Sequence, residues 1–140
     1  MKFISSYYDS VGGGSTASVE HLGKIFYGYA QLHPEDSGSN FFGCRIAEQR
    51  AEIKALKYER NKLKEEAEIC RKFVQACKQY KQFNEEDPSA KSMLRQLNVK
   101  INKVNELASI IGFKMLKIKQ DVVERKAILD KFAKKDNPSE

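Results

Sequence analysis

The feature that most constrains this chain is a run of more than 40 residues, between Gly43 and Pro88, without a glycine or a proline. The run is rich in Ala, Glu, Lys, Arg and Gln, which are strong helix formers. Its apolar residues recur alternately three and four positions apart, with Gln49 and Arg60 in the polar gaps, which is the spacing of a heptad seam. They are Ile46, Ile53, Leu56, Leu63, Ala67, Cys70, Val74 and Cys77. We therefore predict a long helix over about residues 43–84.

A second long helix is predicted over about residues 88–134. Asp87 is a good N-cap residue, and Pro88 suits the first helical position. The apolar seam of this segment is more regular than that of the first, and only Arg125 interrupts it. Its members are Leu94, Leu97, Ile101, Val104, Ala108, Ile111, Met115, Ile118, Val122, Arg125, Leu129 and Phe132. Because only a short polar turn separates the two helices, residues 43–135 should fold as an antiparallel coiled-coil hairpin.

The register of this hairpin depends on where the turn is centred. A centre at residues 84–87 places Cys70 beside Ile101 and Ala67 beside Val104. A slip of one heptad is the main competing register, since it preserves the apolar spacing.

The N-terminal segment, residues 1–42, has a different character, because it is aromatic and rich in glycine. Its glycine run, 12–14, predicts a flexible break. Val19, Leu22, Phe26 and Tyr29 have helical spacing, so we predict a short helix over about residues 17–32, followed by a loop. Residues 136–140 are expected to be a disordered tail. The predicted fold class is all-α: a long hairpin on which the short helix packs, joining a helical bundle on oligomerisation.

Apolar residues exceed what one hairpin can bury. Between Val104 and Ile118 the second helix is apolar on more than one side, which is typical of a helix that is covered on more than one side. We expect a non-enzymatic scaffold or adaptor that binds protein partners, as a homo-oligomer, with a homodimer first, or as a subunit of a larger assembly. The expected partner-binding residues are Phe26, Tyr27, Tyr29, Leu107, Ile110, Phe113 and Leu116.

The net charge of +6, from 25 basic and 19 acidic side chains, suggests an alternative. Four lysines flank the second seam and could contact the phosphates of a nucleic acid or an acidic protein surface. They are Lys100, Lys103, Lys114 and Lys117. Leu107 and Ile110 interrupt this stripe, and no aromatic residue that could stack on bases lies between the lysines. Nucleic-acid binding is therefore the second hypothesis.

The sequence offers no catalytic, cofactor or metal motif. The glycine run lacks the lysine of a phosphate-binding loop, and neither His21 nor His33 belongs to a nucleophile or zinc pattern. The three cysteines, an odd number without an export signal, indicate reduced thiols in an intracellular compartment, cytoplasmic or, in a eukaryote, nuclear. No stretch approaches the roughly 18 apolar residues of a transmembrane helix. We predict that the protein is not an enzyme, binds no cofactor or metal and does not span a membrane.

Overall fold

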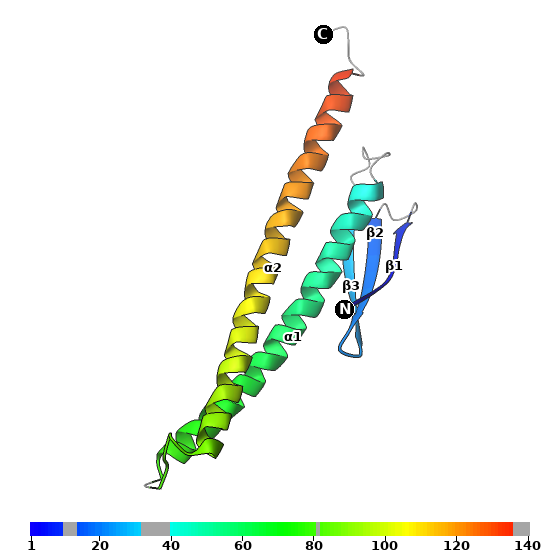
Figure 1. The fold of residues 1–140 in the computed structure, drawn as a ribbon. Helices are drawn as coiled ribbons and strands as arrows, with labels where there is room; N and C mark the ends of the chain where they lie inside the picture. Colours follow the sequence, from blue (N-terminus) through cyan, green and yellow to red (C-terminus); the bar gives the residue numbers. More distant parts are fainter. Residues whose placement is uncertain (10–13, 32–39, 81, 136–140) are drawn as a thin grey trace. The chain divides into compact units, whose positions relative to one another are not determined.

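The computed structural model describes residues 1–9, 14–31, 40–80 and 82–135, and it combines a small sheet with two long helices (Figure 1). Three strands come first: β1 (Lys2–Asp9), β2 (Gly14–His21) and β3 (Lys24–Gln31). Helices α1 (Asn40–Lys78) and α2 (Pro88–Lys135) follow. The chain is thus mostly helical, but the prediction of an all-α fold is wrong for its N-terminal part. Glycines 12 and 13, the predicted loop at 33–39 and the predicted tail at 136–140 lie outside the described residues.

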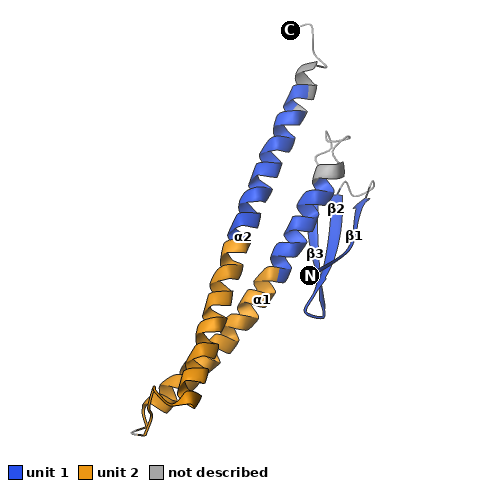
Figure 2. Ribbon diagram, viewed as in Figure 1, with its two compact units in different colours: residues 1–55, 111–140 blue, residues 56–110 orange. Residues whose placement is uncertain are grey.

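The chain divides into two compact units, which Figure 2 colours separately. The first unit contains the sheet, the beginning of α1 and the end of α2, that is, residues 1–55 and 111–140. The second unit, residues 56–110, contains the rest of both helices and the turn between them. Each unit is described by itself below.

In the first unit, β1, β2 and β3 form an antiparallel sheet in sequence order. The predicted helix over residues 17–32 is wrong, because this segment is the hairpin of β2 and β3. Leu22 and Gly23 form its two-residue turn, and both have positive φ angles, 52° and 76°, as a type I′ turn requires. The strand between Lys24 and Gln31 is rich in Ile, Phe and Tyr, which favour strands over helices.

Small residues let α1 pack unusually close to this sheet. Gly28 of β3 lies against the backbone of α1, where a Cβ atom would overlap the carbonyl oxygen of Ala47 and lie 2.5 Å from the amide nitrogen of Ala51. The side chains buried at this contact are themselves mostly small, and two clusters of them form the core. The clusters contain Ala17, Val19, Ala30, Ile46, Ala47, Ala51 and Ala55, with Phe26 and Ile118 packed against them. Ile118 brings α2 into the core of the first unit.

The helices largely follow the predicted boundaries. α1 begins three residues earlier than predicted and ends at Lys78, six residues before the predicted end. There, Gln79 and Tyr80 donate backbone hydrogen bonds to the carbonyls three residues before them, which is the tight turn common at helix ends. The start of α2 is confirmed: Pro88 is its first residue, and Asp87 accepts a hydrogen bond at Oδ1 from the backbone nitrogen of Ser89, at 3.3 Å.

The predicted seam of α1 is confirmed, since each of its apolar members is buried or half-buried. The predicted seam of α2 is half right. Leu97, Val104, Ile111 and Ile118 are covered, but the other half of the covered stripe is Lys100, Leu107, Lys114 and Asp121. The residues predicted there are more exposed: Ile101 is 40%, Met115 45% and Val122 44% exposed. Helix α2 therefore turns a different flank toward α1 than apolar spacing alone predicts.

Ion pairs between the helices match this orientation and show how the helices are aligned. In the second unit, Lys100 Nζ lies 3.0 Å from Glu66 Oε2. The predicted register would place Lys100 opposite Arg71, a like charge, five residues further along α1. In the first unit, Lys114 Nζ lies 2.7 Å from Glu52 Oε2. The predicted register is therefore wrong by five residues, because α1 ends earlier than predicted and the centre of the turn moves with it.

Candidate functional site

The outer apolar face of α2 is an exposed hydrophobic surface of the first unit. We use this name for three side chains that share one flank of the helix and that α1 and the sheet leave uncovered: Phe113, Leu116 and Val123. Phe113 is 68% and Val123 67% exposed, and Leu116 is 54% exposed. Exposed apolar residues are ordinary when scattered singly, but three large ones on the same flank of one helix are of the kind that can mark an interaction site.

A second exposed surface covers the face of the sheet that points away from α1. Tyr7 and Tyr29 flank Thr16 in one row across the strands, and Tyr27 lies beside Ser18 in the next row. The three tyrosines are 51–59% exposed, whereas the central strand contributes small hydroxyl residues. The hydroxyls of Ser5 and Ser18 are hydrogen-bonded to each other at 3.0 Å. Tyrosines thus flank Thr16 on both sides, whereas Ser18, which is buried, has Tyr27 on one side and Ser5 on the other.

The structure separates the expected partner-binding residues into two groups. Tyr27, Tyr29, Phe113 and Leu116 are exposed, and Ile110 is at the border of exposure at 36%. Leu107, in contrast, is only 3% exposed, and Phe26 packs against the buried residues of the core. These last two side chains serve the packing of the chain itself, because the true orientations of α2 and β3 turn them inward. Sequence reasoning missed Val123, and it placed Met115 and Val122, which are exposed, in the seam.

The four lysines of the nucleic-acid alternative do not form a continuous free stripe. Lys100 and Lys114 are half-buried and form the ion pairs with Glu66 and Glu52. Lys103 lies 3.9 Å from the carboxylate of Glu106, one turn along the same helix. Lys117 is exposed. Two of the four cations are therefore occupied by carboxylates of α1, which lowers the charge that a phosphate backbone would meet.

A polar cluster lies inside the first unit. Asp121 is 3% exposed, and its Oδ2 lies 3.2 Å from Arg45 Nε and accepts a hydrogen bond from Gln49 Nε2 at 3.1 Å. A buried carboxylate needs such partners, because an unpaired charge away from water is costly. The cluster contains one acid, one permanent cation and one amide, so it has no pair of groups that could exchange a proton in catalysis. It holds α2 against α1.

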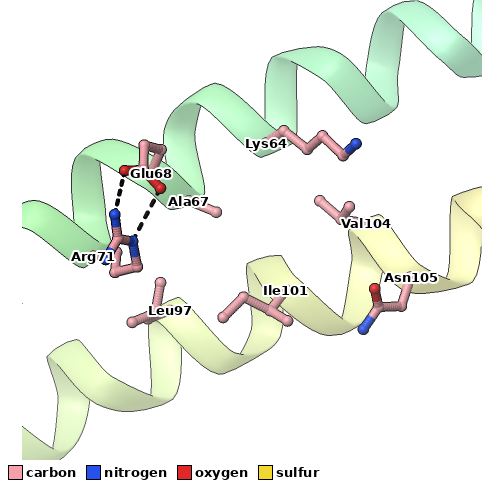
Figure 3. A pocket seen from close by; sticks show the side chains of 8 residues that line it. All are labelled: Lys64, Ala67, Glu68, Arg71, Leu97, Ile101, Val104 and Asn105. Carbon is pink, nitrogen blue, oxygen red and sulfur yellow. Dashed lines mark hydrogen bonds and ion pairs between the residues drawn. The ribbon is translucent and has the colours of Figure 1, made fainter.

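Described residues of the second unit line at least two clefts. The smaller, of about 150 Å³, lies where the helices run side by side, and Figure 3 shows its eight lining residues, among them Leu97, Ile101 and Val104. At one end the Arg71 guanidinium donates two hydrogen bonds to the Glu68 carboxylate, one of them from Nε at 3.0 Å. These bonds lower the pKa of Glu68 and raise the pKa of Arg71. A cleft of this size is below the range of small-molecule sites, about 300–1,000 Å³.

The larger cleft, of about 490 Å³, lies at the tip of the helical hairpin. Its lining is mostly aromatic and apolar, with a few polar groups from the turn. The residues are Phe73, Cys77, Tyr80, Gln82, Phe83, Asn84, Asp87, Ser89, Ala90 and Met93. Sequence reasoning noted the aromatic residues near the turn as surplus apolar surface but did not predict that they enclose a space.

In comparisons with known proteins, no protein-family model, curated protein or solved structure matches the chain significantly. Among the described residues, no three His, Cys, Asp or Glu side chains are placed to hold a metal ion. The thiols of Cys44, Cys70 and Cys77 are free and half-buried. Within the described ranges, neither helix has a stretch apolar enough to cross a membrane.

Proposed function

We propose that this protein is a non-enzymatic interaction module that self-associates through the outer apolar face of α2. The observation that carries the proposal is the exposure of Phe113, Leu116 and Val123 on one helix whose other side already packs within the chain. Burying a Phe or Leu side chain is worth about 1.5–3 kcal/mol, so covering this face offers a substantial driving force for association.

One pair of opposite charges beside the face allows a second copy of the chain to be the partner. Lys117 and Glu124 are both exposed and lie seven residues apart, and therefore on the same flank of α2. In an antiparallel pair of α2 helices related by a two-fold axis, each Lys117 can face Glu124 of the other chain. A surface that carries both members of such a pair is complementary to itself, as a two-fold interface must be. The tyrosine face of the sheet is left free for further protein partners.

Sedimentation velocity at about 10 μM tests this proposal. We expect the wild-type chain to sediment at twice the 16.0 kDa chain mass, and the double variant Phe113→Glu, Leu116→Glu to sediment as a monomer with unchanged helical circular dichroism. Each substitution occurs twice in a two-fold interface, so two changes introduce four charges into the apolar contact. Val99→Glu is the matched control, because Val99 is 61% exposed on the same helix but lies outside the face.

Two results would contradict the proposal. A wild-type chain that stays monomeric at this concentration would exclude self-association of useful strength. Dissociation by Val99→Glu as well as by the double variant would show that added charge, and not loss of the face, separates the chains. A filter-binding series addresses the alternative: retention of DNA or RNA at about 50 mM salt that is lost on reversing the charges of Lys103 and Lys117 would favour nucleic-acid binding.

A further inference from the structure

Helix α2 carries residues for two alternative seams, which share one stripe. The shared stripe is buried or half-buried, and it consists of Leu97, Val104, Ile111 and Ile118. On one side of it lies the covered stripe, also buried or half-buried: Lys100, Leu107, Lys114 and Asp121. On the other side lies the exposed stripe: Ile101, Ala108, Met115 and Val122. Because all three stripes repeat every seven residues, either side stripe can complete a seam with the shared one.

The chemistry of the two side stripes is the reverse of what burial favours. Three of the four members of the covered stripe are charged, and only Leu107 is apolar, whereas every member of the exposed stripe is apolar. An apolar side chain gains free energy on leaving water, and a charged one loses it unless it is paired. The seam in the structure therefore leaves apolar surface uncovered along α2, while a more apolar seam exists on the same helix.

Ion pairs hold the covered stripe against α1. In the second unit, Lys100 Nζ lies 3.0 Å from Glu66 Oε2, and in the first unit, Lys114 Nζ lies 2.7 Å from Glu52 Oε2. The salt bridge of the buried Asp121 acts in the same way. The side chains of the two lysine–glutamate pairs are 30–43% exposed. Pairs that solvent reaches contribute little to stability, so the advantage of this seam is small and depends on charge.

The smaller cleft of the second unit lies on the same side of α2 as the exposed stripe. Figure 3 shows Ala67 of α1 and Ile101 of α2 on opposite walls, with Leu97 and Val104 of the shared stripe beside Ile101. A turn of α2 by about 50° around its own axis exchanges the covered stripe for the exposed one. This turn moves Ile101 toward the small Ala67 side chain, into a space of about 150 Å³.

We propose that α2 is a rotary switch: ion pairs hold it in the arrangement described here, and their loss lets it turn and bury the exposed stripe against α1. The shared stripe keeps its contact with α1 in both arrangements, so the hairpin stays folded during the change. Two packings of one sequence that differ little in free energy are a recognised basis of switching. The outer apolar face lies roughly 120° or more from either seam around the helix, so the switch is independent of the proposed self-association.

Two cysteine reporters in the second unit test the turn. Ile101→Cys marks the exposed stripe and Leu107→Cys the covered one, each in the full chain with the native thiols replaced by Cys44→Ser, Cys70→Ala and Cys77→Ala. Glu52→Lys and Glu66→Lys break two ion pairs from the side of α1, so α2 differs only at the reporter. The rate of alkylation by iodoacetamide is measured by mass spectrometry, and circular dichroism checks that the helices are intact.

We expect the two reporters to change in opposite directions when the charges are reversed. A minor conformation is populated to about 10% at most, so making it the major one should speed alkylation at Leu107→Cys at least about tenfold. Alkylation at Ile101→Cys should slow by about the same factor. Loosening or unfolding of the hairpin would instead speed both reactions. Any result other than opposite changes would overturn the proposal.

A charge swap is the matched control. Adding Lys100→Glu and Lys114→Glu to the reversed chain restores two pairs of unlike charges and should return both alkylation rates to about their starting values. A swap that fails to restore them would show that the ion pairs do not hold α2, and would overturn the proposal. Protection of Ile101→Cys that depends on protein concentration would do the same, because a second chain, and not α1, would then cover the exposed stripe.

Discussion

Because α1 lies so close to Gly28, adding a single methyl group at this position should lower the free energy of unfolding. In Gly28→Ala the new Cβ would overlap the carbonyl oxygen of Ala47 and lie 2.5 Å from the amide nitrogen of Ala51. Both obstacles are backbone atoms of a helix, so no side-chain rotation can relieve the clash. The helix must retreat by about 1 Å to restore ordinary contact distances, and a gap of that size forfeits a quarter to a half of each affected dispersion contact.

The expected cost follows from how well this contact is packed. Overpacking of a tight core typically costs about 1–3 kcal/mol, and the upper end applies where the backbone itself must move. We therefore expect Gly28→Ala to lower the free energy of unfolding by about 3 kcal/mol. For a chain of this length that corresponds to a fall in Tm of about 10 °C. The clash outweighs the gain of about 0.4–1 kcal/mol that replacing a glycine brings through the unfolded state.

Gly112→Ala is the matched control, and its expected change in the free energy of unfolding has the opposite sign. Gly112 lies inside α2, and a Cβ there would have no heavy atom within 4 Å. Alanine is the better helix former by about 0.8–1 kcal/mol, so this variant should be more stable than the wild type. Urea denaturation followed by circular dichroism at 222 nm, with all chains at one concentration, measures both. If Gly28→Ala unfolds within 0.5 kcal/mol of the wild type, on the scale of the predicted loss, α1 does not pack against β3 as described.

Two further predictions concern charged groups. Replacing Asp121 by Asn should lower the free energy of unfolding by about 2 kcal/mol, because a buried charge-assisted contact with the partly exposed Arg45 is lost. Combining it with Arg45→Met should cost less than the two single changes together. Strict additivity of the two changes in urea denaturation would refute the pairing. Since the Arg71 guanidinium lowers the folded-state pKa of Glu68, this carboxylate contributes stability above its unfolded pKa of about 4.3 that is lost as the pH falls through the lower folded value. Denaturation of wild type and Glu68→Gln at several pH values should show a small difference at pH 7 that vanishes in acid, and a difference that grows in acid would contradict the assignment.

The helices were predictable from the sequence because their signals are local. Strong helix formers, a heptad spacing and the Asp87–Pro88 start predict α2 to within a residue and α1 to within six residues at its ends. The orientation of α2 was not predictable in the same way. Apolar residues surround much of this helix, so several flanks could have faced α1, and the choice depends on ion pairs such as Lys114 with Glu52 between residues distant in sequence.

The sheet was missed because its two faces reverse the usual distribution of side-chain size. On β3 the inward-facing residues include Gly28 and Ala30, and the outward-facing ones are Ile25, Tyr27 and Tyr29. A search for large apolar residues at regular spacing finds the exposed face and can mistake it for a helical stripe. The alternation of β3 becomes clear only when its small residues are taken as the buried ones. They are buried because α1 packs so close to the sheet that larger side chains would not fit, and the sequence of the strand alone does not show this contact. The candidate interaction surface was found only in part for the same reason, since exposure depends on which flank each element presents.

The opposite charges at Arg45, Glu52, Lys114 and Asp121 also act as a check against misalignment. Residues 45 and 52 are one heptad apart on α1, and residues 114 and 121 are one heptad apart on α2; in the native pairing each contact joins unlike charges. A slide of one heptad in one direction would set Lys114 against Arg45, and a slide in the other would set Asp121 against Glu52. The apolar seam tolerates either slide, but each then brings two like charges together in a poorly hydrated place. Each neighbouring alignment therefore loses both native ion pairs and gains one contact between like charges.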